Sequence, residues 1–283
     1  MLNRCAYILT VDVGNTFIRF GLFAEDSAAA QERPLATCEI TTPARITADE
    51  ARMRLVQVMA ALAADAGMPG ALVPAAAVLS CVVPALERPW KAALFRTCTG
   101  RVLTVGPGLK TGIPVHYDDP AEIGPDRIAD AVAARAVYGS PCIVIDLGTT
   151  TNIEVIDAHG TFVGGVIAPG LALGARSLSA AAARLPQVEP SAPTHVIGRN
   201  TREAMRSGVV LGEVARIDGM LDMVLAEMRA TKAAGEGDVP IVITGDDAEA
   251  LAALVGHSLT VDDALTLRGL AELYRISQKP RRA

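Results

Sequence analysis

The sequence predicts an α/β fold built from two similar halves, and two observations carry this prediction. An apolar strand that ends in an aspartate, a glycine-bearing turn and a second strand occur at residues 11–23 and again at 144–157, about half the 283-residue chain apart. Strand and helix patterns alternate after both copies. The matched residues are Asp12, Gly14 and Thr16 in the first copy and Asp146, Gly148 and Thr150 in the second. A repeat of this kind indicates an internal duplication of one α/β unit.

Composition and charge exclude several classes of protein. The chain is 51% hydrophobic with only 4% aromatic residues, which favours alanine-rich helices packed on strands of Val and Ile. The net charge is −5 and no basic stripe occurs beyond the terminal "KPRRA", so nucleic-acid binding is not expected. No segment approaches the roughly 18 apolar residues of a membrane span, and the short apolar run near the N-terminus is interrupted by Asp12. We therefore expect a protein that binds neither nucleic acid nor membranes.

The cysteines and histidines indicate a cytoplasmic location and no structural metal. The five cysteines are scattered without a CxxC pair, so we expect reduced and mostly buried thiols. The four histidines show no metal-ligand spacing.

The first half, residues 1–120, reads as two strands followed by alternating helices and strands. We expect strands at 6–13, 17–23, 75–83 and 101–105, and helices at 47–67 and around Trp90. Thr47 and Glu50 have the spacing of a capping box at the start of the first helix, and Gly67 ends it. The apolar residues at helical spacing in this helix are Met53, Val56, Ala60 and Ala63.

The second half, residues 121–283, follows the loop "YDDPAEIGPD" and has the same character. Its expected strands lie at 142–149, 152–157, 160–168 and 239–245. Its expected helices lie at 127–139, 171–184, 202–229, 246–256 and 265–276. Two α/β halves with matched hairpins result.

The two hairpins suit phosphate binding. A glycine in a turn lets backbone N–H groups approach a ligand, a neighbouring Thr or Asn adds side-chain hydrogen bonds, and an aspartate can hold a hydrated cation. One such hairpin alone is most simply an ordinary turn, but two matched copies favour a phosphate clamp with a metal between the halves. The rival motifs fail, because "GLKTG" at 108–112 lacks the spacing of a P-loop and "GPGLKTG" misses GxGxxG by one residue.

At this point the sequence resembles a known family, type III pantothenate kinase, within the superfamily of acetate and sugar kinases, heat-shock ATPases and actin. The resemblance covers nearly the whole chain. It rests on "DVGNT", "SCVVP", "GPDRIADAVAA", "DLGTTT", "GGVIAPG", "IGRNTREAMRSG", "ITGD" and "LTLRGL", in the family's order and spacing. It implies a duplicated actin-like (ribonuclease H-like) ATPase fold, with a cleft between two α/β halves, and transfer of the ATP γ-phosphoryl group to pantothenate.

The resemblance also implies roles for individual residues. Asp126 matches the catalytic base, and Asp146 is similar to the family's ligand for a monovalent cation, K⁺ or NH₄⁺. Pantothenate binding is implied for Tyr117, Gly124, Pro125, Asp126, Arg127 and, across a dimer interface, Thr201. ATP binding is implied for Asp12, Val13, Gly14, Asn15, Thr16, Phe17, Ile18, Arg19 and Thr149. Mg²⁺ would bridge ATP phosphates near Asp12, through water.

The residues themselves fit part of this picture. In "IGPDR", Gly124 precedes a helix, Pro125 takes its first position and Asp126 lies in its first turn, where the helix dipole favours an ionised carboxylate. Arg127 could bind a substrate carboxylate in a bidentate fork. Tyr117 taken alone could equally be a packing residue. Thr201 taken alone is most simply the N-cap of the helix that begins at Arg202.

The sequence departs from the family pattern at several positions. Thr150 and Asn152 replace the family's usual alanine and threonine but keep a small polar turn, and Pro125 stands in "GPDR" where the family has "GADR". Asp246 stands in "TGD" where the family has a glycine near the nucleotide. A carboxylate facing the phosphates would repel them, so nucleotide preference is the open point.

Two other functions remain open, and a homodimer is expected. Another small-molecule kinase of the superfamily would lack "YDDPAEIGPDR", and a non-catalytic regulator would have lost one of the three key aspartates. The homodimer expectation rests on Gly208 and Gly212, which are four residues apart in the helix of residues 202–229, and on an apolar stripe through Ile217, Leu221 and Val224. Packing of that stripe within one chain is the alternative.

Overall fold

The computed structural model describes residues 6–25 and 32–278, so Cys5 lies outside it. The chain divides into two compact units. The first contains the described residues up to 137 and from 264 onward, and the second contains residues 138–263. This division differs from the expected boundary at residue 120, because the helix at 125–138 groups almost entirely with the first unit and the C-terminal helix returns to it. The units are described separately below.

The first unit contains a five-stranded mixed sheet. Its strands are β1 (Tyr7–Val13), β2 (Phe17–Ala24), β3 (Ala36–Thr41), β4 (Ala76–Cys81) and β5 (Val102–Thr104), in the order β3-β2-β1-β4-β5. The strands β1, β2 and β3 are antiparallel neighbours, whereas β4 and β5 extend the sheet in parallel from β1. Strand β1 is therefore central and is buried along nearly its whole length. The sequence predicted every strand here except β3.

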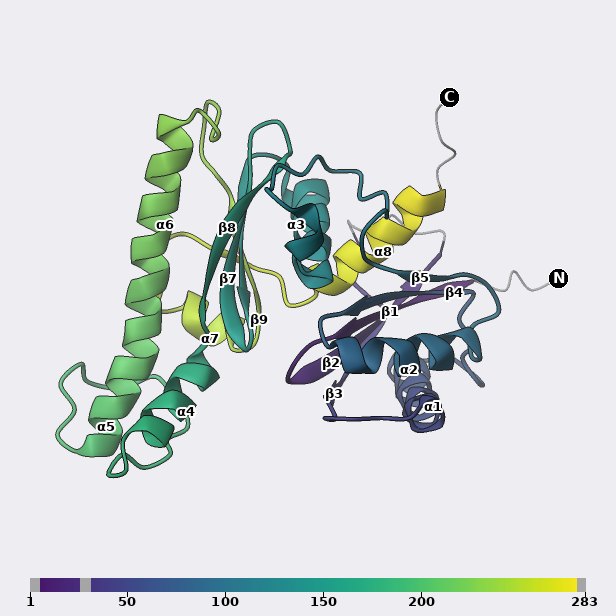
Figure 1. Ribbon diagram of the computed structural model, residues 1–283, viewed down its shortest axis with the longest axis horizontal. Coiled ribbons are helices and arrows are strands. Elements are labelled where there is room, and N and C mark those ends of the chain that lie inside the picture. The colour runs from purple at the N-terminus through teal and green to yellow at the C-terminus, as the bar shows by residue number, and fades with distance from the viewer. Residues whose placement is uncertain (1–5, 26–31, 279–283) are drawn as a thin grey trace. The chain divides into compact units, whose positions relative to one another are not determined.

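Helices α1 (Ala48–Asp65) and α2 (Pro84–Phe95) cover one face of this sheet (Figure 1). The predicted capping box of α1 is present, because the Thr47 side chain accepts from the Glu50 backbone and the Glu50 carboxylate accepts from the Thr47 backbone. The predicted apolar face of α1 was wrong. Met53 and Val56 are more than half exposed, and Ala60 is also exposed. The buried face instead contains Ala51, Leu55, Val58, Met59, Leu62 and Ala63.

Helix α8 (Leu265–Gln278) contacts β1, β2 and β4, and α3 (Pro125–Tyr138) packs on α8. Side chains alternate along a strand, so Thr10 and Asp12 lie on the other side of β1 from the residues that meet α1 and α2. The approach of α8 to α3 requires Gly269, since an added Cβ there would stand 1.9 Å from the Ala129 carbonyl oxygen. The helix that carries Asp126 is thus held by backbone contact.

The second unit repeats the same sheet. Its strands are β6 (Cys142–Leu147), β7 (Thr150–Ile156), β8 (Phe162–Pro169), β9 (Ile241–Gly245) and β10 (Thr260–Val261), in the order β10-β9-β6-β7-β8. Again the first three are antiparallel and the last two add in parallel beside the first. The order of β6 to β10 corresponds strand by strand to that of β1 to β5. The predicted internal duplication is therefore confirmed, and only the two-residue β10 was missed in this unit.

The helices of the second unit are α4 (Leu171–Ala181), α5 (Thr201–Arg206), α6 (Gly212–Ala230) and α7 (Ala248–Ala252). A π-helical segment, η2 (Ser207–Leu211), joins α5 to α6, so the helix predicted at 202–229 exists with this irregularity. A short 3₁₀ turn, η1 (Pro120–Glu122), precedes α3 in the first unit. Ile217 and Leu221 are almost fully buried in the core of the second unit, and Val224 packs against that core. This apolar stripe therefore serves the chain's own packing.

Candidate functional site

The first hairpin turn is fixed by backbone and threonine hydrogen bonds. The Gly14 amide donates to the Phe17 carbonyl oxygen at 3.0 Å, and the Thr42 hydroxyl donates to the Gly14 carbonyl oxygen at 2.7 Å. The Thr42 amide also donates to the Thr16 carbonyl oxygen at 2.9 Å. Thr42 follows β3, the strand that was not predicted. The turn is therefore rigid, while Asn15 and Thr16 at its tip are exposed to solvent.

Asp12 is an almost buried carboxylate at the end of β1. Only 8% of the residue is exposed, and its Oδ1 atom has no hydrogen-bond partner. Burial and, to a smaller extent, the charge of Asp126 raise the pKa of Asp12 to about 6, although Ser80 and Arg19 act in the opposite direction. Desolvation disfavours the charged form of a carboxyl group, and a nearby like charge adds to that effect. Asp12 and Asp126 are thus electrostatically coupled within the first unit.

Ser80 is a residue of this site that the sequence analysis did not single out. It stands directly opposite Asp12 on the parallel strand β4 and is fully buried. Its hydroxyl is near enough to lower the pKa of Asp12, yet Ser80 Oγ makes no hydrogen bond of ordinary geometry. The signal was present in "SCVVP", but only strand pairing shows that its serine faces Asp12.

Arg19 lies on the other side of Asp12, on β2, and is its partner in the strand register. Its Nε forms an ion pair with Glu39 at 3.0 Å, and its guanidinium lies 5.8 Å from the centre of the Phe17 ring. These contacts hold an arginine beside the first hairpin.

The start of α3 has the predicted form. Pro125 is the first helical residue, and the Asp126 Oδ1 atom accepts a hydrogen bond from the Arg127 amide at 2.9 Å. Burial raises the pKa of Asp126, while backbone hydrogen bonds and the Arg127 charge oppose the rise. Gly124 is required here, since an added Cβ would stand 2.3 Å from Asp126 Oδ1. Tyr117, in the preceding loop, is half-buried.

The second hairpin depends on close backbone approach. The Gly148 amide donates to the Thr150 carbonyl oxygen at 3.0 Å, and the Gly170 amide donates to the Thr149 carbonyl oxygen at 3.1 Å. A Cβ on Gly170 would stand 2.2 Å from the Gly148 carbonyl oxygen. Gly245 has a φ of 89°, and a Cβ there would stand 2.7 Å from Asp146 Oδ1. Only glycine fits at these two positions.

A buried polar network anchors this hairpin to α6, and the sequence analysis did not find it. The Thr151 hydroxyl donates to Glu213 Oε1 at 2.6 Å, and both residues are buried. Arg216 forms an ion pair with Glu213 and donates to the Pro169 carbonyl oxygen. Such a network is hard to read from sequence, because its members lie about sixty positions apart.

Asp246 lies beside the second hairpin. Its amide donates to the Leu147 carbonyl oxygen at 2.5 Å. It also lines a cavity of about 50 Å³ in the second unit. The other lining residues are Leu147, Gly148, Thr151, Leu171, Ala172, Asp247 and Leu251. The departure from the family pattern at this position therefore lies next to the hairpin glycine.

Thr201 is not the N-cap of its helix, contrary to the simplest interpretation of that residue taken alone. The N-cap of α5 is Asn200, whose side chain accepts from the Glu203 amide at 3.0 Å, and Thr201 is the first helical residue. Asn200 is the better cap, because its side-chain oxygen reaches the third helical amide. Thr201 is left exposed at the start of α5.

The sequence-predicted residues thus fall into three groups, one in the first unit, one in the second hairpin and one at the start of α5. The first unit contains Asp12 to Arg19 and Gly124 to Arg127, and the charges of Asp12 and Asp126 interact there. In the second unit, Asp146 and Thr149 lie in the second hairpin, and Thr201 lies at the start of α5.

The four cysteines within the described residues have the properties of unreactive thiols. Cys38, Cys81, Cys98 and Cys142 are free thiols, and burial raises the pKa of each, to about 11 for Cys81 and Cys98 and about 12 for Cys142. A thiol with so high a pKa is a poor nucleophile. Among the described residues, no group of three or more His, Cys, Asp or Glu side chains could hold a metal ion. No helix in the described ranges is long and apolar enough to cross a membrane.

The buried charge of Asp12 predicts a pH-dependent cost in stability. The pKa of Asp12 is about 6 in the folded protein against 3.8 for the free side chain. Its contribution to the free energy of unfolding is therefore fully present below about pH 4 and is lost as the pH rises through 6. The shift corresponds to about 3 kcal/mol at neutral pH. Asp12→Asn should therefore raise the unfolding temperature of the ligand-free protein at pH 7.5 and leave it nearly unchanged at pH 4. Thermal unfolding in EDTA measures this.

Asp118→Asn is the matched control, because Asp118 is an exposed carboxylate of the same unit. It should change the unfolding temperature little at either pH. An Asp12→Asn variant that is no more stable than the wild type at pH 7.5 would contradict the buried-charge interpretation.

Comparison with solved structures supports the fold. A protein from Campylobacter jejuni assigned to the Baf family of transcriptional activators has a TM-score of 0.55 at 18% identity, covering 95% of this chain and 98% of that one. A ROK hexokinase from Thermus thermophilus has a TM-score of 0.50 at 13% identity, covering 96% and 100%. These likenesses concern the fold alone, and they confirm the duplicated actin-like ATPase fold.

Sequence relatives identify the family. The type III pantothenate kinase of Koribacter versatilis (strain Ellin345) is 37% identical over 275 residues, covering 96% of each chain. The type III pantothenate kinase of Nocardia farcinica (strain IFM 10152) is 40% identical over 285 residues, covering 97% of this chain and 99% of the relative. The family model for type III pantothenate kinase matches residues 8–223. With the hairpins and "GPDR" in place, the chain belongs to the type III pantothenate kinase family.

Proposed function

We propose that this ATP-dependent kinase transfers the γ-phosphoryl group of ATP to the primary hydroxyl of pantothenate, which gives 4′-phosphopantothenate for coenzyme A biosynthesis. Its family membership supports the reaction. The single structural observation that carries the residue assignment is the coupling of two aspartates in one unit, Asp12 at the first hairpin and Asp126 at the start of α3. Phosphoryl transfer needs charge stabilisation and a positioned acceptor, and these two carboxylates supply one group for each task.

In this proposal the first hairpin binds ATP phosphates. Asn15 and Thr16 are exposed at the tip and can donate side-chain and backbone hydrogen bonds. Val13 and Ile18 are fully buried, so they contribute backbone groups only. Arg19 supplies a positive charge beside the turn. The remaining proposed ATP-binding residues are Asp12, Gly14 and Phe17 in this hairpin and Thr149 in the second.

Mg²⁺ fits at Asp12. A buried carboxylate oxygen without a hydrogen-bond partner is the kind of group that a hydrated cation satisfies, and Asp12 Oδ1 is such an atom. When bound, Mg²⁺ would neutralise charge on the ATP phosphates. Ser80 stands opposite Asp12 in register on the neighbouring strand, and its buried hydroxyl, which has no hydrogen-bond partner, is a second polar group at this position. Both residues are this chain's own contribution to the metal site.

Asp126 accepts the hydroxyl proton of pantothenate in this mechanism. Its burial raises its pKa above the usual range, which makes it a better proton acceptor than an exposed aspartate. The Arg127 amide holds one carboxylate oxygen, Oδ1, which fixes the orientation of the group. The other proposed pantothenate-binding residues are Tyr117, Gly124, Pro125, Arg127 and, from a second copy of the chain, Thr201. The cytoplasmic location expected from the scattered cysteines stays a prediction.

The Asp126 assignment predicts a specific kinetic phenotype. Asp126→Asn keeps the size of the side chain but cannot accept the proton, so turnover should fall by roughly 10² to 10⁴. ATP-analogue binding should persist, because Asp126 lies outside the first hairpin. The measurement is formation of 4′-phosphopantothenate from ATP, Mg²⁺, K⁺ and pantothenate, beside a titration with a non-hydrolysable ATP analogue.

Asp118→Asn again serves as the control and should retain full turnover. Near-normal turnover of Asp126→Asn would remove Asp126 from the catalytic role, and joint loss of turnover and nucleotide binding would indicate a structural one. If the wild-type protein forms no product, the proposed function itself fails.

A monovalent cation is proposed at Asp146. A carboxylate beside phosphate groups repels them, so a cation between them is needed, and K⁺ and NH₄⁺ are the candidates. Replacing K⁺ by Na⁺ or by a bulky organic cation should lower turnover, and Asp146→Ala should abolish this difference between salts. Asp238→Ala, at an exposed loop position of the same unit, should keep it. Equal wild-type rates in all of these salts would exclude the assignment.

A homodimer is proposed on a different surface from the stripe that first suggested it. Val196 and Ile197, just before α5, are 72% and 83% exposed, and Leu173 and Leu178 on α4 are also partly exposed. Helix α4 contacts η2, which continues α5, so these side chains belong to neighbouring elements. Exposed apolar groups in this number favour a covered surface, and a second copy of the chain is the simplest cover.

Light scattering at micromolar concentration should therefore show a dimer. Ile197→Glu should shift it toward the monomer, because a carboxylate would be buried in the interface. Met53→Glu, at an exposed apolar position on α1, should leave the dimer intact. A wild-type protein that is wholly monomeric would refute the proposal.

A further inference from the structure

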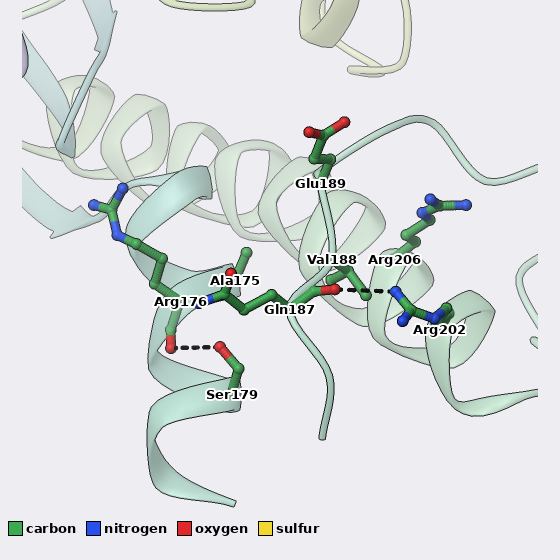
Figure 2. Close-up of a pocket in the computed structure, with 8 residues that line it drawn as sticks. All are labelled: Ala175, Arg176, Ser179, Gln187, Val188, Glu189, Arg202 and Arg206. Carbon is green, nitrogen blue, oxygen red and sulfur yellow. Dashed lines mark hydrogen bonds between the residues drawn. The ribbon is translucent and has the colours of Figure 1, made fainter. Parts of the chain in front are cut away.

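A cavity of about 480 Å³ lies in the second unit, apart from both hairpin turns. Figure 2 shows it between α4, the segment at residues 187–189 and α5. Its lining residues are Ala175, Arg176, Ser179, Gln187, Val188, Glu189, Arg202 and Arg206. The volume is in the range of small-molecule sites, which is roughly 300–1,000 Å³. None of these residues belongs to the proposed ATP or pantothenate sites.

The cavity carries excess positive charge. Three arginines and one carboxylate residue, Glu189, are among its lining residues, and two of the arginines, Arg202 and Arg206, come from α5. In the part of the chain that the structure describes, neither Arg202 nor Arg206 has a carboxylate within ion-pair distance. Arg202 donates to the Gln187 carbonyl oxygen at 3.1 Å, a neutral acceptor. The Nε atom of Arg206 is buried and has no hydrogen-bond partner.

The position of these arginines on α5 makes this arrangement unfavourable without a ligand. Arg202 and Arg206 are four residues apart, so they lie on the same side of a helix, where like charges repel. Helix α5 is only six residues long. Glu203, on the same helix, is exposed, and its side chain accepts from the Arg199 amide, which lowers the pKa of Glu203. The Arg206 charge contributes to this lowering, but the two side chains form no ion pair. A buried donor without a partner, such as Arg206 Nε, is also unfavourable because it has lost its hydrogen bonds to water. An anion held by both arginines would remove both penalties.

We propose that this cavity binds the phosphate group of a small molecule, at the wall formed by Arg202 and Arg206. Figure 2 shows these two side chains next to one another on α5, whereas the Arg176 guanidinium points away from them. Two guanidinium forks match the two charges and several oxygens of a phosphate monoester, whereas one carboxylate would neutralise only one of them. Phosphate therefore fits this wall better than a carboxylate does.

The rest of the cavity defines what the phosphate is attached to. Ser179 and Gln187 offer polar groups, and Ala175 and Val188 offer apolar contact. Glu189, on another wall, would repel a second anionic group there. The ligand is accordingly a compact molecule with its phosphate at one end and a polar, uncharged body. Inorganic phosphate shares the recognised chemistry without the body.

The test uses the full-length protein with its nucleotide site filled by a non-hydrolysable ATP analogue and Mg²⁺. Two probes are titrated by calorimetry at constant ionic strength, inorganic phosphate and glycerol 3-phosphate, a compact phosphate ester with an uncharged polar body. We expect saturable binding of phosphate, and R202Q/R206Q should weaken it at least tenfold, since charge-assisted hydrogen bonds are lost. Arg229→Gln, at an exposed position on α6 away from the cavity, should bind as the wild type does.

The two probes distinguish the source of the phosphate. Tighter binding of glycerol 3-phosphate than of phosphate, lost in the double variant, would identify a phosphate ester as the ligand class. Equal binding of both would indicate recognition of the phosphate group alone, which still supports the site. Unchanged affinity in R202Q/R206Q, no binding at millimolar concentration, or equal displacement by chloride would overturn the proposal, the last as an adventitious ion only.

If R202Q/R206Q does not fold, the Arg206→Lys variant tests the proposal in its place. It keeps the charge but loses the fork and the Nε donor, so it should weaken phosphate binding less than the double variant does. Pantothenate kinase activity should stay unchanged in Arg206→Lys. Phosphate binding at this cavity and pantothenate kinase activity are therefore measured separately.

Discussion

The first unit is organised around one constraint, a carboxylate held almost out of water at the end of its central strand. The ionised form of the Asp12 carboxyl group would be favoured if the group were exposed or paired. Its Oδ1 atom, however, has no hydrogen-bond partner and is buried from water. Its immediate neighbours are a serine on β4, an arginine on β2 and the charge of Asp126, and only the first two favour ionisation. A buried carboxylate that costs stability is a candidate functional group, which supports the ligand-binding role proposed for Asp12.

The second unit repeats the topology of the first, but its hairpin aspartate has different surroundings. Asp146 corresponds to Asp12, yet it is partly exposed, and its hairpin is held by glycines whose backbones pack directly on the turn. The extra anchor is Glu213 of α6, which accepts from Thr151 and pairs with Arg216. Duplication thus preserved the strand order while the two aspartates acquired different surroundings. That difference is consistent with two different cations, one at each hairpin.

Local signals explain what the sequence predicted, and non-local packing explains what it did not. The capping box at Thr47 and the proline at the start of α3 involve residues within one turn, so they were predicted correctly. The buried face of α1 was not, because alanines and scattered apolar residues such as Met53 fit two helical phases, and only contact with the sheet selects one. The pairing of Ser80 with Asp12, and the use of Ile217 for internal packing, likewise depend on elements distant in sequence.

The negative charges near the second hairpin give a physical reason for the monovalent cation proposed there. Asp246 lines the same small cavity as Gly148, and Asp247 follows it. Asp146 adds a third carboxylate at the same end of the sheet, since β6 and β9 are parallel neighbours. A phosphate brought to this hairpin would meet several negative charges at once, and like charges a few ångströms apart cost several kcal/mol at the effective dielectric of a protein surface, about 20. Without the Asp246 carboxylate that repulsion would be smaller. An Asp246→Gly variant should therefore depend less on its monovalent cation than this chain does, measured as the ratio of turnover in K⁺ to turnover in Na⁺.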